Sequence, residues 1–212
     1  YASMGNYVFW RRALKEVPFE DCRRSTDHDF GRTIVPEMIP RGRVYAFDFL
    51  SYPVEGTSPY EEKGYWRDVG TLERYWSAHM DCLGREPKFE LYNRRWPIRT
   101  GAPELPPAHL DRCEVVDSLV SEGTVMHECK MVRSFIGRGC VIEPNCEVED
   151  SIVMDYAVLQ SGVRIKRAIL DRHNVIPAGQ SVGLDPTADP RRGYHVDKAG
   201  LTVVPRGVTR LE

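Results

Sequence analysis

The second half of the chain repeats one arrangement of small, apolar and turn-forming residues. Four segments align, DSLVSEGTVM, RSFIGRGCVI, DSIVMDYAVL and RAILDRHNVI, which begin at Asp117, Arg133, Asp150 and Arg167 and so are 16, 17 and 17 residues apart. In each segment a small residue precedes two apolar residues, and a second apolar pair follows about six positions later. This spacing is typical of the hexapeptide repeat of a left-handed parallel β-helix, which has three short strands in every turn.

A single turn of such a helix cannot bury its own inward side chains, so successive turns must stack. We expect the stack to contain two buried columns, one formed by Leu119, Ile136, Ile152 and Ile169 and the other by Val125, Val141, Val158 and Val175. The alternative is an irregular β-sandwich in which the periodicity is accidental. Repetition of both columns at the same spacing favours the β-helix.

The first 96 residues have a different pattern, in which short strand-like and helix-like stretches alternate. SMGNYVF and RVYAFDFL predict strands, RRALKEV predicts a short helix, and HDFGRTIVPEMI predicts a turn followed by a helix. Alternation of this kind indicates an α/β architecture.

The clearest helix of the chain follows GYWRDVG at residues 64–70. Thr71 is the expected N-cap and Gly84 the expected stop. The apolar face consists of Leu72, Tyr75, Trp76, Met80 and Leu83.

Between the two patterns lies PIRTGAPELPPAHLDR, at residues 97–112. Its four prolines disfavour regular structure, and we interpret it as an extended connector. The expected organisation is therefore an α/β domain at residues 1–96, the connector at 97–112 and the β-helix at 113–212.

Composition excludes several classes of protein. The 212 residues carry a net charge of −2 with no basic patch, which disfavours nucleic acid, and no apolar run has the length of a membrane span. The six cysteines form no CxxC pair, so we expect mostly buried, reduced thiols in a cytoplasmic protein. The chain opens at Tyr1 inside a predicted strand, without an initiator Met or a signal peptide, and this leads us to expect part of a longer protein.

Several motifs resemble one family over nearly the whole chain. They are ASMGNYVF, HDFGRTIVP, GYWRDVGTLERYW, LYNRRWPI, DSLVSEG, AILDRHNVIPAG and GLTVVP. Together they resemble the second half of ADP-glucose pyrophosphorylase, also called glucose-1-phosphate adenylyltransferase. The resemblance implies the second half of a Rossmann-like nucleotidyltransferase domain followed by a left-handed β-helix. It also implies a magnesium-dependent reaction of ATP with glucose 1-phosphate, giving ADP-glucose and pyrophosphate for glycogen or starch synthesis, in an allosteric homotetramer.

The resemblance assigns a catalytic role to the GYWRDVG motif. Transfer of a nucleotidyl group needs positioning and neutralisation of charge, and Mg²⁺ prefers carboxylate and phosphate oxygens. Asp68 is the expected magnesium ligand, Trp66 is expected to line the sugar pocket, and Gly64 and Gly70 are expected to allow tight bends. The spacing alone equally allows a surface Asp beside a core Trp.

Four residues of the first domain match family positions that contact glucose 1-phosphate: Ser3, Tyr7, Asp29 and Phe30. Hydroxyl groups suit phosphate and sugar oxygens, and a carboxylate suits a sugar hydroxyl. Without the resemblance, Ser3 and Tyr7 are typical of a structural strand, and DFG alone is a weak motif that lacks the other kinase signatures. The family usually has Ser before HDFG and GKD at its end, whereas this chain has Asp27 and GRT.

Arg172 matches a family position at the regulatory site, where the phosphate of an adenine-nucleotide inhibitor is held. A guanidinium suits phosphate, and Arg164, Lys166 and Arg167 add positive charge nearby. The alternative is a solvated arginine at a turn. A hexapeptide acyltransferase would instead use His127 or His173 as a general base, but such enzymes typically lack the preceding α/β domain.

One family feature has no counterpart in these 212 residues: the glycine-rich loop, with its Arg and nearby Lys, that cradles ATP. We therefore expect the ATP site to lie mostly outside this chain and the chain alone to be inactive. Two alternatives stay open. The chain could be a non-catalytic module that binds sugar phosphate or an effector, or it could derive from a related pyrophosphorylase that uses another nucleotide.

Overall fold

The computed structural model describes residues 3–42, 44–99, 105–185 and 187–207. The chain divides into two compact units, residues 1–53 and residues 54–212. Among the described helices, none combines the length and the apolar character needed to cross a membrane.

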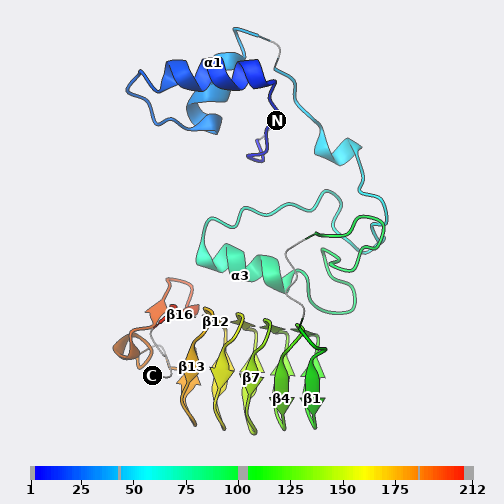
Figure 1. Cartoon of the computed structure of the whole chain (residues 1–212), viewed down its shortest axis with the longest axis vertical. Coiled ribbons are helices and arrows are strands. Elements are labelled where there is room, and N and C mark those ends of the chain that lie inside the picture. Colours follow the sequence, from blue (N-terminus) through cyan, green and yellow to red (C-terminus); the bar gives the residue numbers. More distant parts are fainter. Residues whose placement is uncertain (1–2, 43, 100–104, 186, 208–212) are drawn as a thin grey trace. The chain divides into compact units, whose positions relative to one another are not determined.

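The first unit contains short helical elements (Figure 1): α1 Arg11–Asp21, the π-helical turn η1 Phe30–Ile34, α2 Val35–Met38 and the 3₁₀ turn η2 Phe49–Ser51. These elements confirm the helix predicted at RRALKEV and the turn and helix predicted at HDFGRTIVPEMI. An ion pair of 2.5 Å between Arg24 and Glu37 joins the end of α1 to α2.

The two strands predicted in this unit are wrong. Among the described residues, SMGNYVF and RVYAFDFL are extended or turn-forming and make no strand ladder, and the second stretch ends in η2. An apolar and aromatic pattern favours extended backbone, but a strand also needs a neighbour to satisfy its N–H and C=O groups. The described residues of the first unit supply no such neighbour, and Val8 and Phe47 are exposed.

The second unit begins with a loop that leads into α3 Leu72–Met80, at the position predicted from the apolar face. The Thr71 side chain accepts a hydrogen bond from the Arg74 backbone N–H at 3.3 Å, which confirms the predicted N-cap. Gly84 lies four residues beyond the helix in the left-handed region, with φ of +90°. The helix itself ends at Met80 with Asp81 as its C-cap, so the predicted stop at Gly84 is wrong by three residues.

From residue 109 onward the second unit contains the predicted β-helix, in which three short strands form each turn and strands of successive turns pair in parallel. Figure 1 shows β1, β4, β7 and β13 stacked side by side. Four complete turns run from β1 to β12, and β13, β14 and β16 continue the three sheets. The first sheet contains β1 His109–Asp111, β4 Val125–His127, β7 Val141–Ile142, β10 Val158–Leu159 and β13 Val175–Ile176. The second contains β2 Glu114–Val116, β5 Lys130–Val132, β8 Glu147–Glu149, β11 Arg164–Lys166 and β14 Ser181–Val182.

The third sheet contains β3 Leu119–Val120, β6 Phe135–Ile136, β9 Ile152–Val153, β12 Ala168–Leu170 and β16 Thr202–Val204, with β15 His195–Val196 antiparallel at its edge. The 3₁₀ turn η3 Pro190–Arg192 precedes β15. The first strand begins at His109, inside the range predicted as connector, because the His109 N–H donates to the Thr124 carbonyl of the next turn at 2.8 Å.

The corners of the β-helix explain the repeat of 16 or 17 residues. At the corner before the third sheet, one residue of every turn has positive φ of 45–50°: Asp117, Arg133, Asp150 and Arg167. These are the first residues of the four aligned segments. A left-handed residue at the same place in each turn bends the chain sharply, so the repeat length is set by three strands and their corners.

The two predicted buried columns need correction. Val125, Val141, Val158 and Val175 do pair in register, but they face outward, and Val141 is 39% exposed. The inward column of the first sheet is the following residue of each strand: Met126, Ile142, Leu159 and Ile176, all 0% exposed. In the third sheet, Leu119, Ile152 and Ile169 face outward, whereas Ile136 faces inward beside Val153. Side chains alternate along a strand, so an error of one position exchanges the two faces.

Helix α3 covers the outward face of the third sheet. Ile152, Ile169 and Leu201 are buried there against side chains of α3, including Tyr75, Trp76 and Met80. The Trp76 indole N–H donates to the Asp150 carbonyl at 2.7 Å. The Arg167 guanidinium lies over the Trp76 ring, 4.6 Å from its centroid, and bonds both carboxylate oxygens of Glu73 at 2.9 Å. The outward apolar residues of this sheet are therefore part of a second, smaller core.

The packing of α3 predicts a pH-dependent stability. His79 lies on α3 with its ring edge-on to Phe135, and burial lowers the pKa of the imidazole below its ordinary value of 6.5. The folded protein therefore holds His79 neutral, whereas the unfolded chain binds a proton below about pH 6.5. The stability that the neutral imidazole contributes is fully present above about pH 6.5 and is lost as pH falls through the folded-state pKa. We expect the urea midpoint to fall between pH 7.5 and pH 5.5.

Substitution His79→Gln is expected to reduce this fall, because glutamine does not titrate. His195 is exposed on β15, so His195→Gln serves as the matched control and is expected to leave the pH dependence unchanged. Equal slopes for the wild type and His79→Gln would contradict the prediction.

Candidate functional site

Three of the four predicted sugar-phosphate residues of the first unit contact one another. The Ser3 and Tyr7 hydroxyls are 2.7 Å apart, and the Tyr7 ring stacks on Phe30 with 6.1 Å between centroids. Phe9 also packs against Phe30, at 5.7 Å. Two hydroxyls and an aromatic face thus lie together on the surface of the first unit, a combination suited to a sugar phosphate.

Asp29 lies beside this group because it caps η1. Its carboxylate accepts the Arg32 backbone N–H at 2.7 Å, and its carbonyl accepts the N–H groups of Thr33 and Ile34 at 2.9 and 3.0 Å. A Cβ on Gly31 would lie 3.3 Å from the Tyr7 hydroxyl and 3.4 Å from an Asp29 carboxylate oxygen. The HDFG turn therefore places the Asp29 carboxylate and the Tyr7 hydroxyl close to the same face of Gly31.

Asp68 and Trp66 lie in the second unit, on the loop before α3. The Asp68 carboxylate accepts the Gly70 backbone N–H at 3.0 Å and forms an ion pair of 2.5 Å with Arg74. Its side chain is 54% exposed, and Trp66 is 41% exposed. The turn at Gly70 and the first turn of α3 thus fix the direction of the carboxylate.

The two glycines of this motif act differently. Gly64 has φ of +67°, which confirms the expected tight bend. Gly70 is not in the left-handed region; a Cβ there would lie 3.1 Å from the Asp68 carboxylate oxygen. A side chain at position 70 would therefore press on the carboxylate, which folds back onto the Gly70 amide.

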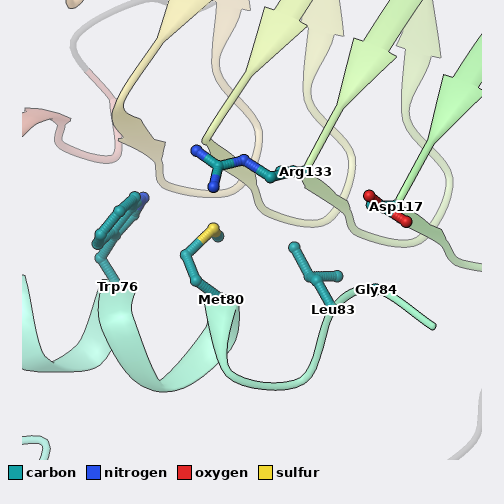
Figure 2. A pocket seen from close by; sticks show the side chains of 6 residues that line it. All are labelled: Trp76, Met80, Leu83, Gly84, Asp117 and Arg133. Atoms are coloured by element: carbon teal, nitrogen blue, oxygen red, sulfur yellow. The ribbon is translucent and has the colours of Figure 1, made fainter. Parts of the chain in front are cut away.

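A pocket of about 250 Å³ lies between α3 and the β-helix corner. Figure 2 shows Trp76, Met80 and Leu83 on one side and Arg133 and Asp117 on the other. Neither Arg133 nor Asp117 was predicted from the sequence to line a site. The available signal was their position at the start of aligned segments, where a charged residue repeats on consecutive turns.

Arg172 lies on the turn between β12 and β13, where its backbone N–H donates to the Asp171 carboxylate at 2.7 Å. Burial raises the pKa of Tyr75 on α3, and the nearby Arg172 charge offsets part of this rise. Arg172 is exposed. It therefore presents a guanidinium at the surface close to α3.

The two histidines considered for acyl transfer have structural partners. His173 stacks on Tyr156 with 5.2 Å between ring centroids and 9° between ring planes, and both occupy left-handed corner positions. His127 lies 3.7 Å from the Asp111 carboxylate and packs against His109. Both histidines thus belong to the side-chain stacks of consecutive turns.

Comparison with known proteins gives two matches, one in each half of the chain, and the boundary between them differs from that between the two compact units. Residues 1–85 match the family model described as nucleotidyl transferase, and residues 106–204 match the model described as GlmU-like, C-terminal hexapeptide. The glucose-1-phosphate adenylyltransferase of Thermodesulfovibrio yellowstonii is 38% identical over 207 residues, which cover 97% of this chain and 50% of that protein. The chain is homologous to the C-terminal half of glucose-1-phosphate adenylyltransferases.

Other adenylyltransferases of this name give the same result. That of Parafrankia sp. is 41% identical over 217 residues, covering 99% of this chain and 52% of the relative. That of Aliivibrio fischeri strain ATCC 700601 is 37% identical over 211 residues, which cover 97% of this chain and 51% of the relative. The chain thus spans about half the length of the curated relatives that it matches.

The donor set for magnesium can be tested against adenylyltransferase chemistry. Among the described residues, no group of three or more His, Cys, Asp or Glu side chains could hold a metal ion. Mg²⁺ often uses only one or two carboxylates together with substrate phosphates and water. Asp68 fits as one such carboxylate, because it is partly exposed and its direction is fixed by Gly70 and Arg74.

Proposed function

We propose that this chain forms the sugar-phosphate-binding and β-helix part of an enzyme that makes ADP-glucose and pyrophosphate from ATP and glucose 1-phosphate. The observation that carries the proposal is similarity to glucose-1-phosphate adenylyltransferases over 97% of the chain. The grouping of Ser3, Tyr7 and Phe30 beside Asp29 supports it independently. In this role the enzyme would contribute to glycogen or starch synthesis in the cytoplasm.

The residues of the chain have separate roles in this reaction. The hydroxyls of Ser3 and Tyr7 bind the sugar phosphate, Phe30 packs on the sugar, and Asp29 accepts hydrogen bonds from sugar hydroxyls. Asp68 supplies one carboxylate oxygen for Mg²⁺, and Trp66 lines the sugar pocket. A bound Mg²⁺ would neutralise charge on the phosphates during in-line attack of the sugar phosphate on the α-phosphorus. The protein itself contributes orientation and charge.

The experiment compares the 212-residue chain with a chimera in which this chain follows the N-terminal half of the T. yellowstonii adenylyltransferase. We expect ADP-glucose from the chimera and none from the chain alone. Turnover by the chain alone would contradict the expected location of the ATP site. A folded chimera that makes no ADP-glucose would contradict the proposed function.

We also propose that the enzyme is a homotetramer that is inhibited by an adenine nucleotide at Arg172. Light scattering of the chimera tests the tetramer, and a mass of one or two chains would contradict it. The support for the regulatory site is the exposed Arg172 guanidinium close to α3, since a guanidinium binds phosphate through charge-assisted hydrogen bonds.

Substitution Arg172→Ala in the chimera is expected to raise the inhibitory concentration of AMP about 10- to 100-fold, the loss of one charge-assisted contact, while leaving the basal rate within about twofold. The measurement is the rate of ADP-glucose formation as a function of AMP concentration. Arg112→Ala is the matched control, because Arg112 is an exposed arginine of the same β-helix that pairs with Glu128 and was not assigned to the regulatory site. An unchanged inhibition curve for Arg172→Ala would remove it from the regulatory site.

A further inference from the structure

A buried carboxylate lies beneath the HDFG turn. Asp21, the last residue of α1, is 3% exposed although it is charged. One of its oxygens is 2.7 Å from the Thr26 hydroxyl, and the other is 2.7 Å from His28 Nδ1. Charged residues are rarely buried without partners, so these two contacts account for the position of Asp21.

The direction of each hydrogen bond follows from the charge of Asp21. The hydrogen bond from His28 lowers the pKa of the carboxyl group most, and the hydrogen bond from Thr26 lowers it further. The carboxyl group is therefore ionised at neutral pH and can only accept hydrogen bonds. The Thr26 hydroxyl and the His28 Nδ1–H must both donate to it. The Thr26 oxygen in turn accepts the His28 backbone N–H at 3.2 Å. His28 is thus held through both its ring and its backbone.

This hold is needed because His28 has an unfavourable backbone conformation. Its φ is +52°, which non-glycine residues adopt at a cost and keep only where neighbouring contacts fix it. The next residue, Asp29, returns to extended backbone with φ of −94° and caps η1. The direction in which the chain leaves His28 therefore decides where the Asp29 carboxylate and the Phe30 ring lie.

We infer that Asp21, with Thr26 and His28, is a positioning group that fixes the turn presenting Asp29 and Phe30 to the sugar phosphate. The inference rests on the proposed function for the identity of the ligand. None of the three residues needs to touch the substrate; they act through the backbone of His28. Loss of the group should therefore affect the binding of glucose 1-phosphate and not the binding of ATP.

The first test uses the 212-residue chain and requires no activity. In Asp21→Ala and His28→Ala, the amide protons of Arg32, Thr33 and Ile34, which bond to Asp29, should exchange at least about tenfold faster than in the wild type. Asp21→Asn and His28→Asn should retain protection within about twofold, because an amide can still donate and accept and asparagine tolerates positive φ.

The matched control is Glu37→Ala, which removes the exposed ion pair with Arg24 in the same unit. We expect it to leave exchange of these three amides unchanged. Unchanged exchange in both alanine variants at positions 21 and 28 would overturn the positioning role, whatever the activity. Equal acceleration throughout the first unit would also overturn it, because that result describes general unfolding.

The second test uses the chimera. Asp21→Ala and His28→Ala are expected to raise KM for glucose 1-phosphate at least about fivefold, while kcat and KM for ATP stay within about twofold of the unsubstituted chimera. In Asp21→Asn and His28→Asn, KM for glucose 1-phosphate is expected to stay close to that of the unsubstituted chimera. Equal changes in all three constants would contradict the inference. A folded but inactive unsubstituted chimera would instead overturn the proposed function and the sugar-phosphate part of this inference, while amide exchange still decides whether Asp21 holds the turn.

Discussion

Substitution Asp68→Asn in the chimera is expected to lower kcat about 10²- to 10³-fold, the size of effect seen when one preorganised electrostatic group is removed. Asparagine retains the oxygen that accepts the Gly70 N–H at 3.0 Å, so the turn should persist. It loses the negative charge, and with it the affinity for a hard cation. The rate of ADP-glucose formation at increasing Mg²⁺ concentration is the measurement, and we expect the variant to need more Mg²⁺.

The fold should be unaffected by this substitution. The Asp68–Arg74 ion pair joins side chains that are 54% and 61% exposed, and exposed pairs of this kind contribute at most about 1 kcal/mol to stability. The urea midpoint of the variant should therefore equal that of the wild type within error. A large loss of stability would show that Asp68 is mainly structural.

Two further variants distinguish the effect of the Asp68 charge from the effects of its ion-pair partner and of loop aspartates in general. Arg74→Ala removes one of the two contacts that direct the carboxylate but leaves its charge, so we expect a smaller loss of turnover than in Asp68→Asn. Asp185→Asn changes another loop aspartate that accepts backbone N–H groups, from Thr187 at 2.9 Å and Ala188 at 3.1 Å, and is the matched control. Near-normal turnover of Asp68→Asn, or an equal loss in Asp185→Asn, would mean that Asp68 is not the catalytic acid group.

The sequence predicted the β-helix because its repeat is local: three strands and three corners return the chain to the same place after 16 or 17 residues. The predicted columns lay on the wrong face because the small residue of each segment was not used to decide which side chains face inward. Ser134 and Ser151 are 0% exposed, and each hydroxyl accepts a backbone N–H of the next turn, from Ser151 at 3.1 Å and from Ala168 at 3.0 Å. A small inward residue requires the next one to face outward and the one after it inward.

The candidate sites were predictable only where their contacts join residues that are close in the sequence. Thr71 as N-cap and the contact of Ser3 with Tyr7, four residues apart, depend on nearby residues. The contact of Tyr7 with Phe30 and the burial of Asp21 beneath His28 depend on how separate segments pack. No periodicity in the sequence encodes those contacts. The resemblance to a family supplied the site residues, but not the side chains that hold them in place.

Substitution Trp76→Ala is expected to weaken the docking of α3 on the β-helix by about 3 kcal/mol, the lower end of the cost of removing a packed tryptophan. The indole packs with Ile152 and Ile169, bonds the Asp150 carbonyl at 2.7 Å and lies under the Arg167 guanidinium. Removing it opens a cavity and leaves Asp150 without this donor. Amide protons of α3 should then exchange about 100-fold faster, since 1.4 kcal/mol corresponds to a factor of ten.

Trp76→Phe divides this effect into its parts, because phenylalanine keeps an aromatic ring but cannot donate. We expect the docking of α3 on the β-helix to weaken by about 1 kcal/mol, because one hydrogen bond is missing. Trp96→Ala is the matched control, because Trp96 is 64% exposed in the same unit, and a change at an exposed position usually stays within about 0.5 kcal/mol.

The loss in Trp76→Ala should be local, because the apolar residues form two separate clusters. The larger one fills the interior of the β-helix with Met126, Ile142, Leu159 and their neighbours, and Trp76 packs only on the smaller one outside the third sheet. Amide protons of the first sheet, such as that of Val141 bonded to the Ala157 carbonyl, should retain their protection while α3 loses it. Equal loss of protection in α3 and in the β-helix would show that the two clusters unfold together, and that α3 is part of the core that stabilises the turns.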